Sequence, residues 1–456
     1  MVRFILPIHG EPRSTSCFPH SNTPHLLQLV TDLESLCPVK MGDFPMASQL
    51  NGLEDETMIP KAALLRVLEG VAVATKASDK QVRMLNDAIL QFQPDQIDHQ
   101  KMESSPSFSQ WCRFMVENPE MATEGVRQLV QVTLAVALLR EKSRRDLPVD
   151  TKSIDKIWGL IHDAVVSASG TALRFTVSRS AQGFLAVPLC SLLENGRIDE
   201  LWRLHTWLPD GQRGISEEVC IHAHQPFGQS WTLLGSGTDC TFEVDAPEDP
   251  SLATHAAYEC CYMSESGQQS AGASGYQTFQ VTSTIRNTGR LFRVKPSNQL
   301  SHSRDMTYSV PGGAYHRSIV SGGKLHATLF VFDSQRGYDD NAAVLGPKNG
   351  VEWAQPRDPA DLTAEVLAQT VDATRRWEQT HETTAGGGNE HPTILGYYRF
   401  FRGLGLLRAG RRDDAMQYLS PAEGPAPEQA FFQEPSEEHQ GYIQKLHELG
   451  ITANTP

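Results

Sequence analysis

The chain has 456 residues, of which 39% are hydrophobic and 21% are charged, as is typical of a globular protein. This length exceeds one compact core, so about two or three structural units are expected. The net charge of −14 argues against nucleic acid or an anionic membrane as the main partner. No apolar run is long enough to span a bilayer, no targeting segment is recognisable, and the cysteines lack CxxC spacing. These features favour a cytoplasmic location.

The first 165 residues carry helical patterns. Ser78 is expected to cap a helix that Pro94 ends. Residues 120–145 have the length of one long helix, and its second half is apolar nearly all round. Residues 151–168 place their apolar side chains on one stripe. We therefore predict a helical N-terminal region over residues 1–165.

The pattern changes near residue 170 to short β-branched or aromatic segments separated by Gly, Pro, Asn and Asp. Such spacing, with few helical segments between, predicts an antiparallel sandwich or barrel over residues 166–335. Residues 246–275 are rich in Ser and Gly and are expected to leave the barrel as an insertion. Helical patterns return in a C-terminal region, residues 336–456, at 361–382, 392–410 and 436–450. The fold class is thus α+β, a central β-barrel flanked by two helical regions.

The helical regions are expected to pack on the barrel, because their stripes of Leu, Val, Phe and Trp would otherwise be exposed. The aromatic segment at 392–410 is the strongest case. The same segment is also a candidate contact for a homodimer.

Two histidines lie one residue apart in the segment VCIHAHQPFG. Residues two apart share one face of a strand, so His222 and His224 can bind one metal ion. Two solvated or hydrogen-bonded strand histidines are the alternative, because this pattern alone is weak evidence for a metal. A third ligand in the right setting is needed.

A second motif supplies that ligand. In the segment VPGGAYHRS, a Pro-Gly turn stands before a histidine that begins a strand: Pro311, Gly313 and His316. Together the two motifs, HxH and PxGxxH, resemble those of the cupins, and Gly235 fits the first motif as well. The resemblance covers about residues 170–335 and implies a small jelly-roll barrel in which His222, His224 and His316 bind one metal. Imidazole ligands predict that the metal is lost as the pH falls through the histidine range.

The departures from the cupin pattern narrow the resemblance. Gln229 stands where many cupins have a glutamate that serves as the fourth ligand. Two interpretations of Gln229 are open: it acts beside the metal, or it is a packed strand residue. A site of three histidines is similar to that of the thiol dioxygenases, in which a His-x-Tyr pair orients substrate and oxygen. Here that pair reads His326-Ala327-Thr328, which makes His326 a candidate catalytic residue and removes the tyrosine. Arg203 is a candidate anchor for a substrate carboxylate, and a surface arginine is the alternative.

The resemblance implies a metal-dependent dioxygenase with Fe(II), acting on dioxygen and a small anionic or chelating molecule. Fe(II) held by a facial set of three ligands leaves positions for a bidentate substrate and dioxygen. Zn, Ni, Mn and Cu remain open as metals, because the same ligands would serve an isomerase, cyclase or lyase that uses the metal as a Lewis acid. A ligand-binding barrel without catalysis is a further alternative. A metal-dependent amidohydrolase is disfavoured, since that fold needs βα units around its HxH motif.

Overall fold

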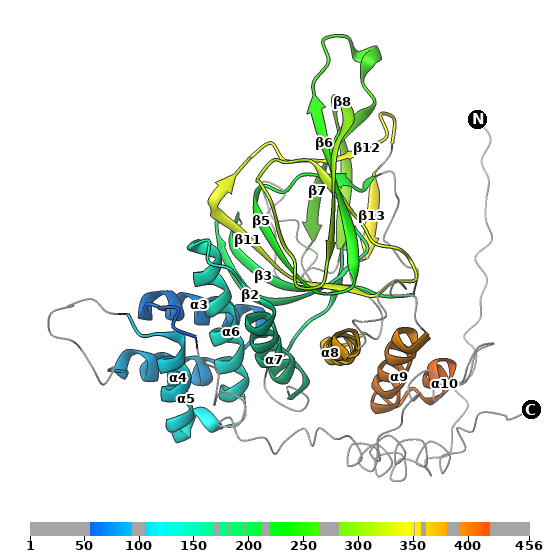
Figure 1. Cartoon of the computed structure of the whole chain (residues 1–456). Coiled ribbons are helices and arrows are strands. Elements are labelled where there is room, and N and C mark those ends of the chain that lie inside the picture. Colours follow the sequence, from blue (N-terminus) through cyan, green and yellow to red (C-terminus); the bar gives the residue numbers. More distant parts are fainter. Residues whose placement is uncertain are drawn as a thin grey trace, which may run out of the picture.

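The computed structural model describes residues 55–93, 105–167, 173–210, 219–263, 282–356, 362–380 and 392–419, apart from residues 124, 181, 196 and 351. These residues form helices and two antiparallel β-sheets, an α+β architecture (Figure 1). The helix predicted at 436–450 lies outside them. Among the helices that are described, none combines the length and the apolar character needed to cross a membrane.

The N-terminal helices form one side of the molecule. They are α3 (Lys61–Thr75), α4 (Asp79–Gln91), α5 (Phe108–Glu117), the 3-10 helix η1 (Pro119–Ala122), α6 (Val126–Arg144) and α7 (Thr151–Ser167). Ser78 caps α4 as predicted, because its hydroxyl accepts a hydrogen bond from the backbone of Gln81. Helix α6 is the central one and is buried along almost its whole length, which confirms the interpretation of its apolar second half.

The first sheet has the strand order β1-β2-β3-β11-β5-β9, and the second has the order β13-β8-β6-β10-β4-β12-β7. The first comprises β1 (Ser178–Arg179), β2 (Leu185–Glu194), β3 (Arg197–Trp207), β5 (Pro226–Leu234), β9 (Thr307–Val310) and β11 (His326–Tyr338). The second comprises β4 (Ile221–His222), β6 (Ser236–Asp245), β7 (His255–Met263), β8 (Thr282–Ser303), β10 (His316–Ile319), β12 (Val344–Gly346) and β13 (Trp353–Pro356). Because the long strand β8 pairs with β7 through its first half and with β6 through its second, the order of the second sheet returns on itself.

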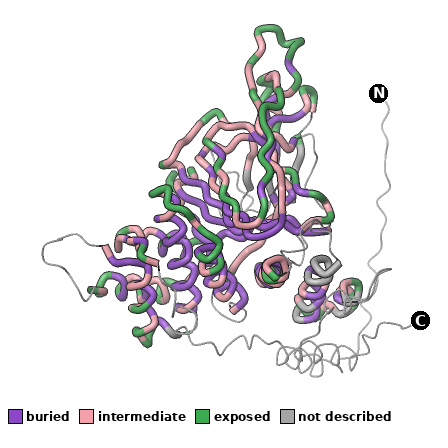
Figure 2. Tube along the Cα trace, viewed as in Figure 1, coloured by how far each residue is buried: buried purple, intermediate pink, exposed green. Residues whose placement is uncertain are grey.

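The largest hydrophobic core lies between the first sheet and the helices. Along β3, Trp202 and Leu204 belong to this core together with side chains of α3, α6 and α7. Strand β11 contributes Leu329 and Val331 to the same core. Figure 2 shows buried residues concentrated in the helices and in the strands above them. The opposite face of the first sheet is thereby left to face the second sheet.

Buried charges also join the helical layer to the first sheet. Arg140 on α6 donates to the carboxylate of Glu200 on β3, with its Nε 2.8 Å from Oε2. Arg144, one turn further along α6, donates to Glu200 and to Asp333 on β11, each at 3.0 Å. Glu200 is wholly buried, so its charge depends on these guanidinium groups.

The C-terminal helices are α8 (Ala364–Thr380), α9 (Pro392–Arg408) and α10 (Arg412–Leu419). Of these, α8 docks on the strands, as expected from its apolar stripe. On α8, the buried Arg375 donates to the carbonyl of Leu233, and Glu378 accepts a hydrogen bond from the backbone of Gly235 at the end of β5. Helix α9 packs between α8 and α10, while its role as a dimer contact stays a prediction.

The structure corrects two of the predicted boundaries. Residues 255–263 of the expected insertion form β7, a strand of the second sheet with Ala256, Ala257 and Tyr258 wholly buried. Polar segments on either side hide this strand in the sequence, and the remainder of the insertion from residue 264 lies outside the described residues. The β region also extends past residue 335, because β11 ends at Tyr338 and β12 and β13 complete the second sheet.

Candidate metal centre

Two adjoining strands of the second sheet bring the three histidines together. His222 ends β4 and pairs directly with His316, the first residue of β10. His224 follows two residues after β4 and is fixed by the second motif, since its carbonyl accepts a hydrogen bond from the backbone of Gly313 at 2.8 Å. Gly313 has φ +76°, which a side chain rarely allows. The Pro-Gly turn therefore positions one histidine through a backbone contact and delivers another.

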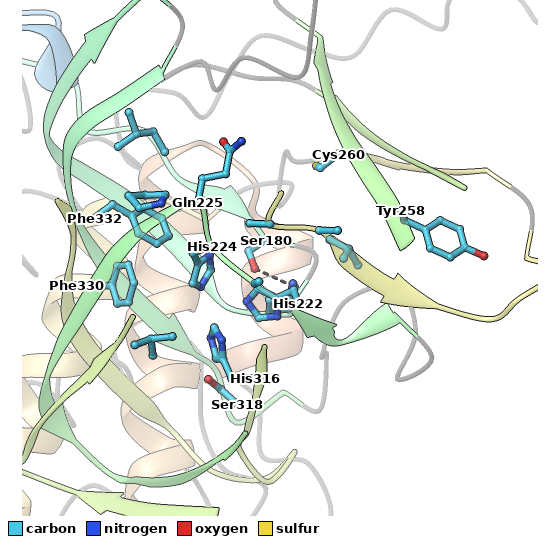
Figure 3. A pocket seen from close by; sticks show the side chains of 18 of the residues that line it. Ser180, His222, His224, Gln225, Tyr258, Cys260, His316, Ser318, Phe330 and Phe332 are labelled. Atoms are coloured by element: carbon cyan, nitrogen blue, oxygen red, sulfur yellow. Dashed lines mark hydrogen bonds between the residues drawn. The ribbon is translucent and has the colours of Figure 1, made fainter. Parts of the chain in front are cut away.

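The imidazole rings point toward one common space (Figure 3). Their ring centroids are 4.5–4.9 Å apart, and one ligand nitrogen from each of His222, His224 and His316 lies within 4.8 Å of the other two. This spacing suits a single metal ion bound by three nitrogens. Among the described residues, no other group of histidines, cysteines and carboxylates meets the same distance criterion.

Backbone carbonyls set the orientation of two of these rings. The Nδ1 atom of His222 lies 2.9 Å from the carbonyl oxygen of Cys220, and that of His316 lies 3.2 Å from the carbonyl of Ala314. A carbonyl accepts hydrogen bonds only, so Nδ1 carries the proton in both rings. The lone pair of each ring is therefore on Nε2, and this is the arrangement that metal-binding histidines usually have.

Burial keeps the three imidazoles neutral. Desolvation lowers the pKa of His222 to about 3 and that of His316 to about 4. It also lowers the pKa of His224 well below its ordinary value, and the two neighbouring histidines and Arg203 contribute in the same direction. A metal ligand must be unprotonated. The cluster is thus in the ligand state at neutral pH.

The histidines line a cavity of about 530 Å³ between the two sheets. Phe330 and Phe332 of β11 form an aromatic wall on the side of the first sheet, and the ring of His224 lies 4.6 Å from that of Phe332 (Figure 3). Tyr258 and Val310 also line the cavity. A cavity with apolar walls and a few convergent polar groups is typical of small-molecule sites.

Arg203 lies in this cavity, as its candidate role requires. It extends from β3 of the first sheet, is only 6% exposed, and has its guanidinium carbon 5.1 Å from the ring centroid of Phe332. Its charge acts on the nearby His224 and lowers the pKa of that imidazole. The surface alternative for Arg203 is therefore wrong.

The structure does not bring Gln229 to the metal centre. Gln229 lies on the face of β5 that meets the helices, where its amide oxygen accepts hydrogen bonds from Ser143 and Arg336, both at 2.6 Å. The neighbouring Trp231 is part of the helix-side core. A catalytic role for Gln229 beside the metal is thus contradicted, because strand residues two apart share one face.

His326 is wholly buried at the start of β11, beyond the residues that line the cavity. Its Nδ1 lies 2.9 Å from the carbonyl of Leu234, and its ring lies 5.1 Å from that of His302 and 5.2 Å from that of Trp207. From this position, His326 does not directly contact a molecule in the cavity. A role for His326 through its neighbours stays a prediction.

Two further residues line the cavity and were not singled out as site residues. His205 lies two residues after Arg203 on the same face of β3, with its ring stacked between Phe184 at 3.9 Å and Phe330 at 4.8 Å. The two-residue spacing from Arg203 is the signal in the sequence that places His205 on this face, with a core or surface histidine as the alternative. Asp239 of β6 has no such signal, because no motif or neighbouring candidate marks its strand.

No protein-family model and no curated protein matches the chain. Among solved structures, the chain is similar to the hydroxypropylphosphonic acid epoxidase from S. wedmorenis, with 9% sequence identity and a TM-score of 0.19. That match covers 61% of this chain and 100% of the other. A score of this size does not establish a shared fold.

Proposed function

We propose that the chain is a metal-dependent oxygenase in which His222, His224 and His316 hold Fe(II) and a small anionic or chelating substrate binds beside them with dioxygen. One observation carries this proposal: three neutral imidazoles converge within 4.8 Å in a cavity between the two sheets. The cupin resemblance of the two motifs supports the same ligand set. Bound iron would supply positions for both dioxygen and a chelating substrate.

The donor set fits a first-row divalent metal. Imidazole nitrogens suit Fe, Zn, Ni and Cu, and the Nε2 atoms of His222 and His316 are the ones left for coordination. Three neutral ligands leave the charge of a divalent ion uncompensated, which favours an anionic ligand in the remaining positions. Arg203 adds a second positive charge to the same cavity.

The residues around the cluster have distinct roles in this proposal. Arg203 would bind a carboxylate or another anionic group, because a guanidinium offers several donors in one plane. Phe330 and Phe332 hold that guanidinium against their rings. His205 can hydrogen-bond to the bound molecule, because its Nε2 is buried without a hydrogen-bond partner among the described residues.

The test is the metal content and oxygen uptake of protein purified without chelators. Alanine at His222, His224 or His316 should each lower bound metal severalfold with unchanged far-UV circular dichroism, whereas His255→Ala, a histidine on β7 outside the cluster, should keep it. Candidate thiols, amines and phenolic acids are then tested for oxygen uptake. Metal retained without oxygen uptake would favour Lewis-acid chemistry with Zn, Ni or Mn, as in an isomerase, cyclase or lyase. Full occupancy in the His316→Ala variant would refute the metal centre.

A further inference from the structure

A second polar cluster lies on the wall of the same cavity, on strands of the second sheet. Asp239 of β6 and Ser318 of β10 face each other across the strand pairing, and both line the cavity together with Tyr308. Behind them lies His302 of β8, with its ring stacked on that of Tyr308 at 4.5 Å. The proposed metal chemistry uses none of these groups.

One oxygen of the Asp239 carboxyl group has no hydrogen-bond partner in the described part of the chain. Its Oδ1 accepts a hydrogen bond from Ser318 Oγ at 2.5 Å, and the nearby Tyr308 hydroxyl also lowers the pKa of the carboxyl, against the larger opposite effect of burial. Its Oδ2 has no partner in hydrogen-bond geometry among the described residues. The nearest cationic candidate is His302, whose Nε2 lies 3.7 Å from Oδ2, beyond hydrogen-bond distance. Asp239 is 4% exposed. A buried carboxylate in this state is costly unless something else compensates it.

His302 does not provide that compensation. It is 2% exposed, neither ring nitrogen has a hydrogen-bond partner in the described part of the chain, and burial lowers its pKa. The ring is also confined, because a Cβ at Gly237 would lie 2.6 Å from its Cε1. A neutral imidazole held in this way cannot serve as the counter-ion of Asp239. Burial correspondingly raises the pKa of the Asp239 carboxyl.

We propose that Asp239 forms a second subsite of the cavity, which binds an ammonium or hydroxyl group of the molecule held at the metal centre. This inference rests on the proposed function. Arg203 projects from the first sheet and Asp239 from the second, so the cavity offers a cation on one wall and an acceptor on the other. The ligand class is therefore a small molecule with an anionic end and, a few atoms away, a hydrogen-bond donor.

The test uses protein loaded with Co(II), whose visible absorption reports ligands near the metal without any turnover. The probes are matched pairs of equal chain length: β-alanine and propanoate, 4-aminobutanoate and butanoate, 5-aminopentanoate and pentanoate, with 4-hydroxybutanoate as the uncharged donor. Dissociation constants come from calorimetry. In the wild-type protein, the best-fitting amino acid should bind about tenfold or more tightly than its matched acid, as expected for one hydrogen bond to a charged group.

Three variants locate the effect. Asp239→Asn, which keeps the size of the side chain, should reduce the amino-acid preference to less than about threefold and leave the affinity for the plain acid unchanged. Ser318→Ala keeps the carboxylate and should retain the preference. Arg203→Gln should weaken both members of each pair alike, so that their ratio is kept. Thermal unfolding and cobalt stoichiometry show whether each variant is folded and loaded.

The outcomes separate the subsite from the metal centre. Acids that bind without any amino or hydroxyl preference, or a preference that survives Asp239→Asn, would overturn the subsite and leave the metal centre intact. A cobalt-loaded protein that binds none of the probes would also overturn the subsite. A wild-type protein that takes up no Co(II) would refute the proposed function, and the subsite that rests on it would be refuted with it.

Discussion

The cluster histidines should keep their metal at a pH at which ordinary histidines release it. Two ligands with the usual pKa of about 6.5 would be about 90% protonated at pH 5.5, and proton competition would weaken metal binding about 100-fold between pH 7.5 and 5.5. In the folded protein, the pKa is about 3 for His222 and about 4 for His316. The same change in pH should then weaken binding less than about twofold.

The metal is therefore expected to dissociate at a lower pH than the ordinary histidine range, which the sequence alone suggests. The measurement is a Co(II) titration followed by visible absorption at both pH values, with far-UV circular dichroism to show that the protein remains folded. Zn(II) measured by equilibrium dialysis gives an independent check. A weakening of tenfold or more in folded protein would mean that a ligand histidine titrates normally, and it would refute the lowering of these pKa values by burial.

The metal-free protein should be sensitive to acid for the same reason. In the unfolded chain these histidines titrate near pH 6.5, so below that pH the unfolded state binds more protons than the folded state. The stability contributed by neutral His222 and His316 is complete above pH 6.5 and is lost as the pH falls toward about 4 for His316 and about 3 for His222. Between pH 7.5 and 5.5 the loss is about 1 kcal/mol for each histidine. Urea unfolding of the apoprotein at both pH values should show this loss of unfolding free energy. In a His316→Asn variant the loss should be smaller by the contribution of one histidine.

Three further predictions concern the turn, the charge network and the remaining histidine. Gly313→Ala should weaken metal binding at least severalfold in a calorimetric metal titration, because a Cβ there would lie 2.3 Å from a carboxylate oxygen. The control is Gly289→Ala, which has a similar φ but nothing within 4 Å of the added Cβ, and it should leave metal binding unchanged. Glu200→Gln should destabilise folding by about 3–5 kcal/mol in chemical denaturation, because Arg140 loses its buried partner; a change below about 1 kcal/mol would contradict the role of the network. His326→Ala should retain full metal by elemental analysis, and metal loss would place it in the ligand set.

The clustering of the three histidines is implied by the resemblance of the two motifs to those of the cupins, whereas the spacing within each motif fixes only local geometry. The HxH spacing puts two rings near one another, and the Pro-Gly turn fixes where the strand of His316 begins. The sequence does not show that the same turn contacts His224 through the backbone of Gly313. That contact joins two loops distant in the chain, and it depends on the pairing of β4 with β10.

The facing of β5 could not be predicted, which explains the wrong role for Gln229. Strand facing is usually assigned by placing apolar residues inside and polar residues outside. Here Ser230 and Trp231 are both buried, so both faces of the strand are covered. Trp231 meets the helices, while Phe330, paired with Ser230 on β11, faces the cavity. The alternation of side chains along a strand shows only which residues share a face. Which of the two faces carries the site is decided by the tertiary arrangement.

This reversed facing also explains why the strands are accompanied by so many helices. In a sandwich with a dry interior, the apolar faces of the two sheets cover each other. In this chain Arg203 and His205 of β3 face the space between the sheets, while Trp202 and Leu204 of the same strand point outward. An outward apolar face must be covered, and α3, α6, α7 and α8 cover it. The helical layer thus provides the hydrophobic core that the strands give up, and the space between the sheets is left for polar groups, the three histidines among them.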